Sequence, residues 1–207
     1  MALFRVLRTA KATLSRTFYL DEVVTSATGS VGVAVTRPDG EIVQSGAATG
    51  PDAESSYAFT FAGSDSLDEL TVTWTATVGG DAIVLDQDVI EVVGGFYFGL
   101  GEARLIDPKF RDTARYTTQD LIDRRVEVEN EFERIAGQAF VPRYARDVLS
   151  GDGGRLLKLR WPRLRRVLAV TVGDSEYPLA TVAEYGSDLL GILRSNSGWP
   201  YGTGNIV

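Results

Sequence analysis

The first half of the chain alternates apolar and polar residues with a period of two, the spacing of side chains on one face of a β-strand. The clearest case is residues 70–78, where one face is entirely apolar and the other carries only threonine. Similar patterns predict strands at residues 31–36, 41–44, 57–61 and 82–93. Trp74 lies at the centre of the apolar face, so we expect it in the core.

Glycine, proline and aspartate separate these short strands, and the Arg-Pro-Asp-Gly run at 37–40 is a typical turn sequence. Short strands at this spacing indicate an immunoglobulin- or fibronectin-like β-sandwich. We expect this domain to cover residues 1–94, with a boundary at Gly94-Gly95. The aromatic residues that follow are expected to form a docking segment that leads into a short helix.

A helix is predicted over residues 118–136, because apolar residues there recur every three or four positions. Thr117 can cap its first turn, Asp120 provides a variant of the capping box, and Gly137 suits the left-handed position after the last turn. An apolar stripe is expected to face the core, and its members are Leu121, Val128, Phe132 and Ile135, flanked by Ile122 and Ala136. A charged face is expected to face solvent, and its members are Asp123, Arg124, Glu127, Glu131 and Glu133.

After Gly137 the apolar residues return to a period of two. Residues 143–149 and 155–159 are expected to pair as a β-hairpin across the glycine-rich turn at 150–154. Further strands are predicted at residues 164–172, 189–193 and 205–207. The expected fold class is therefore α+β, in which the β-sandwich is followed by a helix-plus-hairpin domain over residues 95–207. Since the chain ends inside a predicted strand, we expect the C-terminal part of this domain to be truncated.

The chain of 207 residues contains no cysteine and no histidine. Disulfides, thiolate chemistry and cysteine-based zinc sites are thereby excluded, as is the usual acid–base side chain at neutral pH. No pair of carboxylates stands out by its spacing, so we expect no catalytic residue, no metal site and no cofactor. Basic residues interrupt the apolar N-terminus, and no apolar run approaches the roughly 20 residues of a membrane helix. We therefore expect neither a signal peptide nor a membrane span.

Charge is divided unevenly along the chain. Residues 1–95 contain five basic and thirteen acidic residues, a net charge of −8, whereas residues 96–207 contain sixteen basic and fifteen acidic residues, a net charge of +1. The two values sum to the −7 of the whole chain. This step in charge indicates two domains with different neighbours.

A basic stretch that begins after the predicted hairpin turn contains no acidic residue. We refer to its charged residues as the arginine cluster, which consists of Arg155, Lys158, Arg160, Arg163, Arg165 and Arg166. These side chains could face DNA phosphates. They could instead form ion pairs with the helix carboxylates Glu127, Glu131 and Glu133 of a neighbouring subunit. A third interpretation is a solvated strand edge, where arginine discourages stray pairing.

The order of motifs in the second half is similar to that of one protein family. A helix is followed by IAGQAFVPRYAR at 135–146, an Asp-Gly turn at 152–153, LLKLRWPRLRRVLAVTV at 156–172 and a Gly-Trp-Pro-Tyr-Gly loop at 198–202. In this order the chain resembles the head-to-tail adaptor proteins of long-tailed bacteriophages. Its N-terminal β-domain and the exit EVVGGFYFGLGEARLIDP resemble the version found in phages of actinobacteria. The family normally continues into a further strand and C-terminal helices, which this sequence does not contain.

The resemblance implies a structural virion protein, not an enzyme, that forms a ring in the neck of the virion, usually a dodecamer. Such a ring docks on the portal protein and receives a head-closure or tail-terminator protein. It surrounds double-stranded DNA without sequence-specific contacts. Carbohydrate or surface binding is the alternative, since Trp199 and Tyr201 in a glycine-rich loop suit stacking on sugars. A carboxylate hydrolase is a third class.

Overall fold

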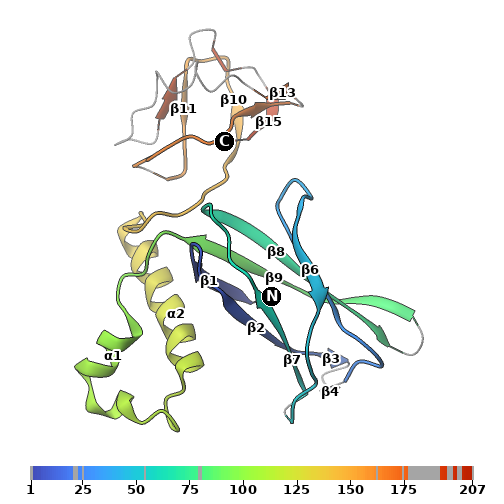
Figure 1. Cartoon of the computed structure of the whole chain (residues 1–207). Coiled ribbons are helices and arrows are strands. Elements are labelled where there is room, and N and C mark those ends of the chain that lie inside the picture. Colours follow the sequence, from blue (N-terminus) through green and yellow to red (C-terminus); the bar gives the residue numbers. More distant parts are fainter. Residues whose placement is uncertain are drawn as a thin grey trace. The chain divides into compact units, whose positions relative to one another are not determined.

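The computed structural model describes residues 2–20, 23–24, 26–53, 55–78, 81–161, 163–173, 175–176, 192–194, 198–199 and 202–206 (Figure 1). It is a mixed α+β structure, as expected. The chain forms two compact units, the first from Met1–Glu131 and Phe140–Tyr144 and the second from Phe132–Ala139 and Ala145–Val207. Residues 96–131 thus cluster with the first unit. The boundary at Gly94-Gly95 stays a prediction.

The first unit is built around a five-stranded sheet with the order β1-β9-β8-β5-β6 (Figure 1). In chain order its strands are β1 (Leu3–Leu7), β5 (Gly32–Thr36), β6 (Ile42–Ala47), β8 (Asp68–Val78) and β9 (Asp81–Val93). Strand β1 runs parallel to β9, and the other neighbours are antiparallel. The predicted strands at 31–36, 41–44, 70–78 and 82–93 are confirmed. The sequence pattern does not predict β1, because Arg5 breaks its alternation.

A second layer of strands shares the core of this sheet. Strand β2 (Ala12–Thr17) pairs antiparallel with β7 (Ser56–Phe61), which confirms the strand predicted at 57–61, and β3 (Tyr19–Leu20) pairs with β4 (Val23–Val24). The largest fully buried side chains of the common core are Trp74, Tyr57, Phe61, Leu14, Leu70 and Ile90. The expected core position of Trp74 is thus confirmed, and layers of strands that enclose one core are compatible with a β-sandwich.

The turn between β5 and β6 forms where the sequence predicts it. The Arg37 backbone N–H donates to the Glu41 carbonyl oxygen (2.9 Å), and Gly40 adopts a φ of +90°, which glycine enters without strain. The Arg37 side chain also donates to Asp68 on β8 (2.8 Å). Its hydrogen bonds to Asp68 and Glu41 raise the pKa of the guanidinium above its usual value. The turn is thereby tied to the adjacent strand.

A buried carboxylate joins three segments of the first unit. The Asp88 side chain on β9 has no exposed surface. It accepts hydrogen bonds from the Trp74 indole nitrogen (3.0 Å), the Arg16 guanidinium (3.0 Å) and the Ala2 backbone nitrogen (2.6 Å). These donors compensate the charge of the carboxylate, although water does not reach it.

Replacing Asp88 with alanine is expected to lower the free energy of unfolding of the first unit by about 3 kcal/mol, because a buried indole N–H and a largely buried guanidinium lose their acceptor. Asp86→Ala is the matched control. Asp86 also pairs with Arg16, but 29% of its side chain is exposed, so we expect a loss below about 1 kcal/mol. Urea unfolding followed by circular dichroism measures both values, and equal losses would contradict the prediction.

Within the described residues, three helical segments follow the sheet: α1 (Leu100–Ile106), the 3-10 helix η1 (Pro108–Arg111) and α2 (Thr118–Ala136). The Asp120 backbone N–H donates to the Thr117 hydroxyl oxygen (3.1 Å), and the Thr117 N–H donates to the Asp120 carboxylate (3.1 Å). Gly137 has a φ of +65°, the left-handed conformation expected after the helix. The predicted limits and caps of α2 are therefore confirmed.

The predicted orientation of α2 is wrong. Of the four residues of the apolar stripe only Leu121 is buried, whereas Val128, Phe132 and Ile135 are 56%, 50% and 72% exposed. The buried residues of the helix are Leu121, Arg125, Val126, Glu129 and Glu133. Their centre lies about a quarter of a turn from the apolar stripe. The physical reason is that Glu129 binds buried arginines, as described below, and turns this polar side of the helix inward.

The second unit contains six short strands within the described residues: β10 (Val148–Gly151), β11 (Leu156–Lys158), β12 (Thr171–Val172), β13 (Ser175–Glu176), β14 (Ile192–Arg194) and β15 (Gly202–Ile206). One sheet has the order β10-β15-β12-β13, and β11 pairs separately with β14. The buried core consists of Leu157, Leu159, Val170, Leu193 and Trp199. Strands near 189–193 and 205–207 are present, although residues 189–191 and 207 lie outside the described residues.

The predicted hairpin between residues 143–149 and 155–159 is wrong. Strand β10 pairs with β15 and β11 pairs with β14, so the two segments enter different sheets. Trp199 instead hydrogen-bonds to the glycine-rich turn that joins the two segments. The Gly153 N–H donates to the Trp199 carbonyl oxygen (2.9 Å), and the Trp199 N–H donates to the Gly154 carbonyl oxygen (2.7 Å). These long-range hydrogen bonds hold the glycine-rich turn in place of a hairpin ladder.

The predicted strand at 164–172 is also wrong, except for its last two residues, which form β12. Leu164, Val167 and Val170 belong to the core of the second unit, at a spacing of three residues. A strand places every second residue on one face, so a regular strand cannot make these contacts. Residues 163–169 therefore lie outside the sheets of the second unit.

Candidate functional site

The arginine cluster lies on the surface of the second unit. All six side chains are exposed, with Lys158 on β11 and four of the arginines on the irregular segment that follows. The Arg160 backbone N–H donates to Asp147 (2.7 Å), and its guanidinium lies 5.7 Å from the centre of the Trp161 ring. None of the six forms an ion pair with another residue that the structure describes. The cluster is therefore available to an anionic partner.

The position of the arginine cluster limits how many of its residues can belong to a solvated strand edge. Only Lys158 lies within a strand, and Arg155 immediately precedes the same strand. The interpretation as a solvated strand edge can therefore apply to these two residues alone. For the remaining four arginines, contact with DNA phosphates or with carboxylates of another subunit stays a prediction.

Two of the three helix carboxylates expected to meet the cluster are exposed. Glu127 and Glu131 are exposed, and Glu127 pairs with Arg124 (2.5 Å) on the same helix. Glu133 is only 8% exposed, so its predicted place on the solvated face is wrong. The rotation of α2 about its axis, set by the buried Glu129, brings Glu133 to the inner side. Glu127 and Glu131 remain candidates for contact with a partner.

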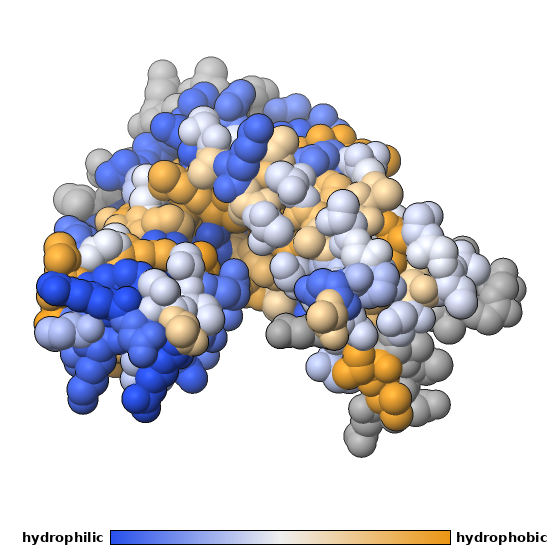
Figure 2. All heavy atoms as spheres, turned by 60° about the horizontal axis from the view of Figure 1, so that its bottom comes forward, coloured by the Kyte–Doolittle hydropathy of each residue, from blue (hydrophilic) through white to orange (hydrophobic). Residues whose placement is uncertain are grey.

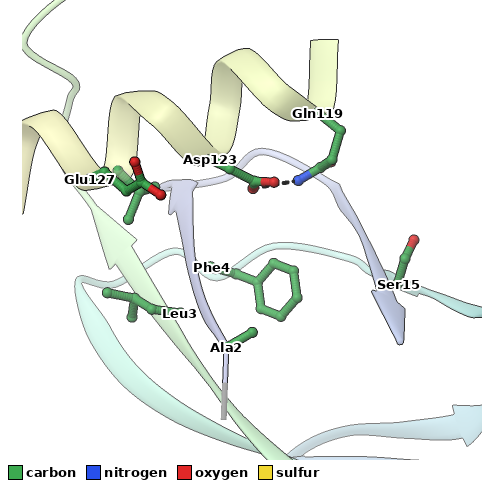
Figure 3. Close-up of a pocket in the computed structure, with 8 residues that line it drawn as sticks. Ala2, Leu3, Phe4, Ser15, Gln119, Asp123 and Glu127 are labelled. Atoms are coloured by element: carbon green, nitrogen blue, oxygen red, sulfur yellow. Dashed lines mark hydrogen bonds between the residues drawn. The ribbon is translucent and has the colours of Figure 1, made fainter. Parts of the chain in front are cut away.

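A groove of about 430 Å³ lies between α2 and the strands β1 and β2 of the first unit (Figure 3). Its lining consists of Ala2, Leu3, Phe4, Ser15, Gln119, Asp123, Val126 and Glu127. The β1 side is apolar, whereas the helix side carries the carboxylates of Asp123 and Glu127. Figure 2 shows a face of the molecule that is hollowed between hydrophilic and more apolar surfaces. The groove thus combines an apolar wall with an acidic rim.

Sequence reasoning missed this groove, because its walls come from residues 2–4 and 119–127, which are far apart in the sequence. The spacing of four residues between Asp123 and Glu127 places both carboxylates on one side of the helix. That spacing alone does not distinguish a binding rim from a solvated face. The apolar wall that distinguishes a binding groove from a solvated face belongs to β1, the strand that the sequence pattern does not predict.

The helix α2 is held to the strands by a buried network centred on Glu129. Its side chain has no exposed surface. It accepts hydrogen bonds from the Tyr97 backbone nitrogen (2.8 Å), from Arg5 (3.1 Å) and from Arg143 (3.3 Å). Arg5 also donates to Glu91 (2.7 Å). Two arginines thus balance two carboxylates, which compensates for the loss of water around them.

Arg125 extends this network with an aromatic contact. Its guanidinium carbon lies 3.4 Å from the centre of the Phe96 ring. Burial lowers the pKa of Arg125, the charge of Glu129 opposes this effect and the charge of Arg5 adds to it. An arginine with such a lowered pKa remains protonated near neutral pH. The buried charges position α2 against the strands.

The phrase Phe140-Val141-Pro142-Arg143-Tyr144 packs on the segment that leaves β9. The Gly94 N–H donates to the Pro142 carbonyl oxygen (2.9 Å), and a Cβ on Gly94 would lie 2.7 Å from the Pro142 Cβ. The Phe140 N–H donates to the Tyr97 hydroxyl (3.0 Å), and the two rings meet edge to face with their centres 6.0 Å apart. Glycine at position 94 is therefore required, and the expected docking role of the aromatic segment is confirmed.

The structure also bears on metal binding and on the stacking of aromatic side chains on sugars. Within the described part of the chain, no group of three or more metal-ligating side chains is arranged around a common point. The same part contains no helix that is long and apolar enough to cross a bilayer. The interpretation of Trp199 as a sugar-stacking residue is wrong, because it is 1% exposed and belongs to the core of the second unit. Tyr201 lies outside the described residues.

No protein-family model matches the chain, and neither a curated protein nor a solved structure is significantly similar to it. The basis for a functional proposal is therefore the geometry of these surfaces together with the order of the sequence motifs.

Proposed function

We propose that the chain is a head-to-tail adaptor, one subunit of a ring in the neck of a long-tailed bacteriophage virion. The observation that carries the proposal is the outward-facing apolar row on α2, formed by Val128, Phe132 and Ile135. Apolar side chains that share one exposed row are typical of surfaces that bind another protein. A subunit that works only in an assembly is expected to bury such a row against its neighbours.

The sequence motifs that carry the family resemblance support the same proposal. Residues 140–144 and the exit from β9 pack on each other in the first unit. They therefore have a structural role, as an architectural protein requires. In this proposal the strands of residues 1–94 form an immunoglobulin-like β-sandwich, and residues 95–207 are the adaptor domain.

The proposed ring lies between the portal protein and a head-closure or tail-terminator protein, and double-stranded DNA passes through its lumen. We assign the arginine cluster to the interface between subunits, where Glu127 and Glu131 of a neighbour are its anionic partners. A basic lining of the lumen would bind DNA phosphates strongly. Strong binding would hinder a polymer that has to slide, so this position is less suitable.

The mass of the assembled particle tests the proposal. The purified chain is mixed with the portal protein encoded in the same genome and analysed by native mass spectrometry and electron microscopy. We expect a ring, or a stable complex with the portal protein whose subunit number follows the portal symmetry. A chain that stays monomeric with the portal protein and binds glycans on an array would contradict the proposal and favour carbohydrate binding.

A further inference from the structure

Among the strands that the structure describes, none pairs with the sheet edge beside the groove of the first unit. Strand β1 lies at one end of the order of its sheet, and β2 belongs to a different sheet. The Val89 N–H donates to the Ala2 carbonyl oxygen and the Arg8 N–H donates to the Val93 carbonyl oxygen, both at 2.9 Å. The even-numbered residues of β1 therefore bond to β9, and Leu3 directs its N–H and C=O groups to the opposite, unpaired side. Such an edge offers backbone groups to an additional segment.

The opposite wall of the groove selects the charge of such a segment. Asp123 and Glu127 stand one helical turn apart on the rim (Figure 3). Asp123 accepts a hydrogen bond from Gln119 (2.8 Å), so the carboxylate is held at the rim. Glu127 forms an ion pair with Arg124, but 61% of the Glu127 side chain and 76% of the Arg124 side chain are exposed. Exposed pairs of this kind exchange partners at little cost. The groove therefore suits a segment with basic and apolar side chains.

The chain itself contains one such segment. Residues 163–169 lie outside the sheets, and Arg163, Arg165 and Arg166 are exposed without an ion-pair partner in the described part of the chain. Leu168 on the same segment is 49% exposed. Leu164 and Val167 pack against the core of the second unit. The segment is therefore anchored on one side and presents arginines and one leucine on the other.

We propose that the groove binds residues 163–169 of a second copy of the chain. This inference rests on the proposed homo-oligomer and names the surface through which two copies contact each other. Arginines of the segment bind Asp123 and Glu127, and Leu168 covers the apolar wall of Leu3 and Phe4. The groove and the segment are different surfaces, so each copy binds one neighbour through its groove and another neighbour through its segment. Contacts of this head-to-tail kind generate rings or filaments rather than closed pairs.

A charge-swap experiment tests this contact. The groove variant carries Asp123→Lys and Glu127→Lys, and the segment variant carries Arg163→Glu, Arg165→Glu and Arg166→Glu. All five side chains are exposed, so we expect both variants to keep the circular dichroism spectrum of the native chain. Each variant alone is expected to associate at least about tenfold more weakly in analytical ultracentrifugation, because like charges then face each other. An equimolar mixture is expected to recover assembly, since every contact again joins opposite charges.

The variant Asp65→Lys with Glu69→Lys is the matched control, because it makes the same change in net charge at exposed residues outside the groove. It is expected to assemble like the native chain. A groove variant that assembles normally, or a mixture that recovers nothing, would overturn the inference. So would a native chain that stays monomeric, since its segment would then be free or bound to its own groove. Binding to the portal protein is measured separately. A groove variant that still forms portal-bound rings overturns only this inference, whereas self-association through the groove without portal binding overturns only the adaptor function.

Discussion

Replacing Glu129 with alanine is expected to lower the free energy of unfolding of the first unit by about 3–5 kcal/mol. Glu129 is fully buried and is the common acceptor for Arg5, Arg143 and the Tyr97 backbone nitrogen. Without it two largely buried guanidinium groups lose a counter-charge and one N–H loses its acceptor. Urea unfolding measures the loss, and hydrogen exchange of residues 3–7 shows whether β1 opens first.

Glu127→Ala is the matched control on the same helix. The Glu127 side chain is 61% exposed and its partner Arg124 is 76% exposed, so we expect a change within about 0.5 kcal/mol. For Glu129→Gln we expect a loss of unfolding free energy between those of Glu127→Ala and Glu129→Ala, because the amide still accepts a hydrogen bond but carries no charge. A loss below about 1 kcal/mol for Glu129→Ala would contradict the conclusion that this network holds α2 to the strands.

Reversing Arg163, Arg165 and Arg166 to glutamate is expected to abolish ring formation or portal binding, while the monomer stays folded. The three side chains are exposed, so their replacement does not disturb a core. In the assembly they would face carboxylates of the next subunit, Glu127 among them, and like charges at an interface cost several kcal/mol. Size-exclusion chromatography with light scattering measures assembly, and circular dichroism measures folding.

Replacing the same three arginines with lysine provides the control, since it keeps the charge and removes only the two-pronged guanidinium geometry. This variant is expected to assemble, although more weakly. Assembly of the glutamate variant together with altered DNA retention would place the cluster in the lumen. Unchanged assembly and unchanged DNA retention would show that the cluster is a solvated surface.

Much of the secondary structure follows from the sequence, because its determinants lie within a few residues of each other. The caps of α2 join Thr117 to Asp120, and the turn between β5 and β6 closes from Arg37 to Glu41. The alternation in β8 places Trp74 in the core, because a strand has only two faces and one of them is entirely apolar. The exposed arginine cluster is also evident from the sequence, since the cost of burying unpaired charge keeps such a row on the surface.

The pairing of strands that are distant in the sequence was beyond the sequence pattern. Strand β1 lies beside β9, and the segments expected to form one hairpin pair instead with β15 and β14. The alternation shows which face of a strand is apolar, but it does not show which strand lies beside it, because several strands have the same alternation. The choice among them depends on hydrogen bonds such as those between Gly153 and Trp199, which only the folded chain brings together.

The orientation of α2 shows the same division between sequence and tertiary structure. The sequence by itself determined that a helix forms over residues 118–136 and where it begins and ends. Only the tertiary structure decided which side of it is buried. The apolar stripe can be recognised from residues of the helix alone. Glu129, in contrast, is buried because Arg5, 124 residues away in the sequence, supplies its counter-charge. That pairing turns the apolar row outward and places Asp123 and Glu127 above β1, which creates the surfaces on which the proposed assembly depends.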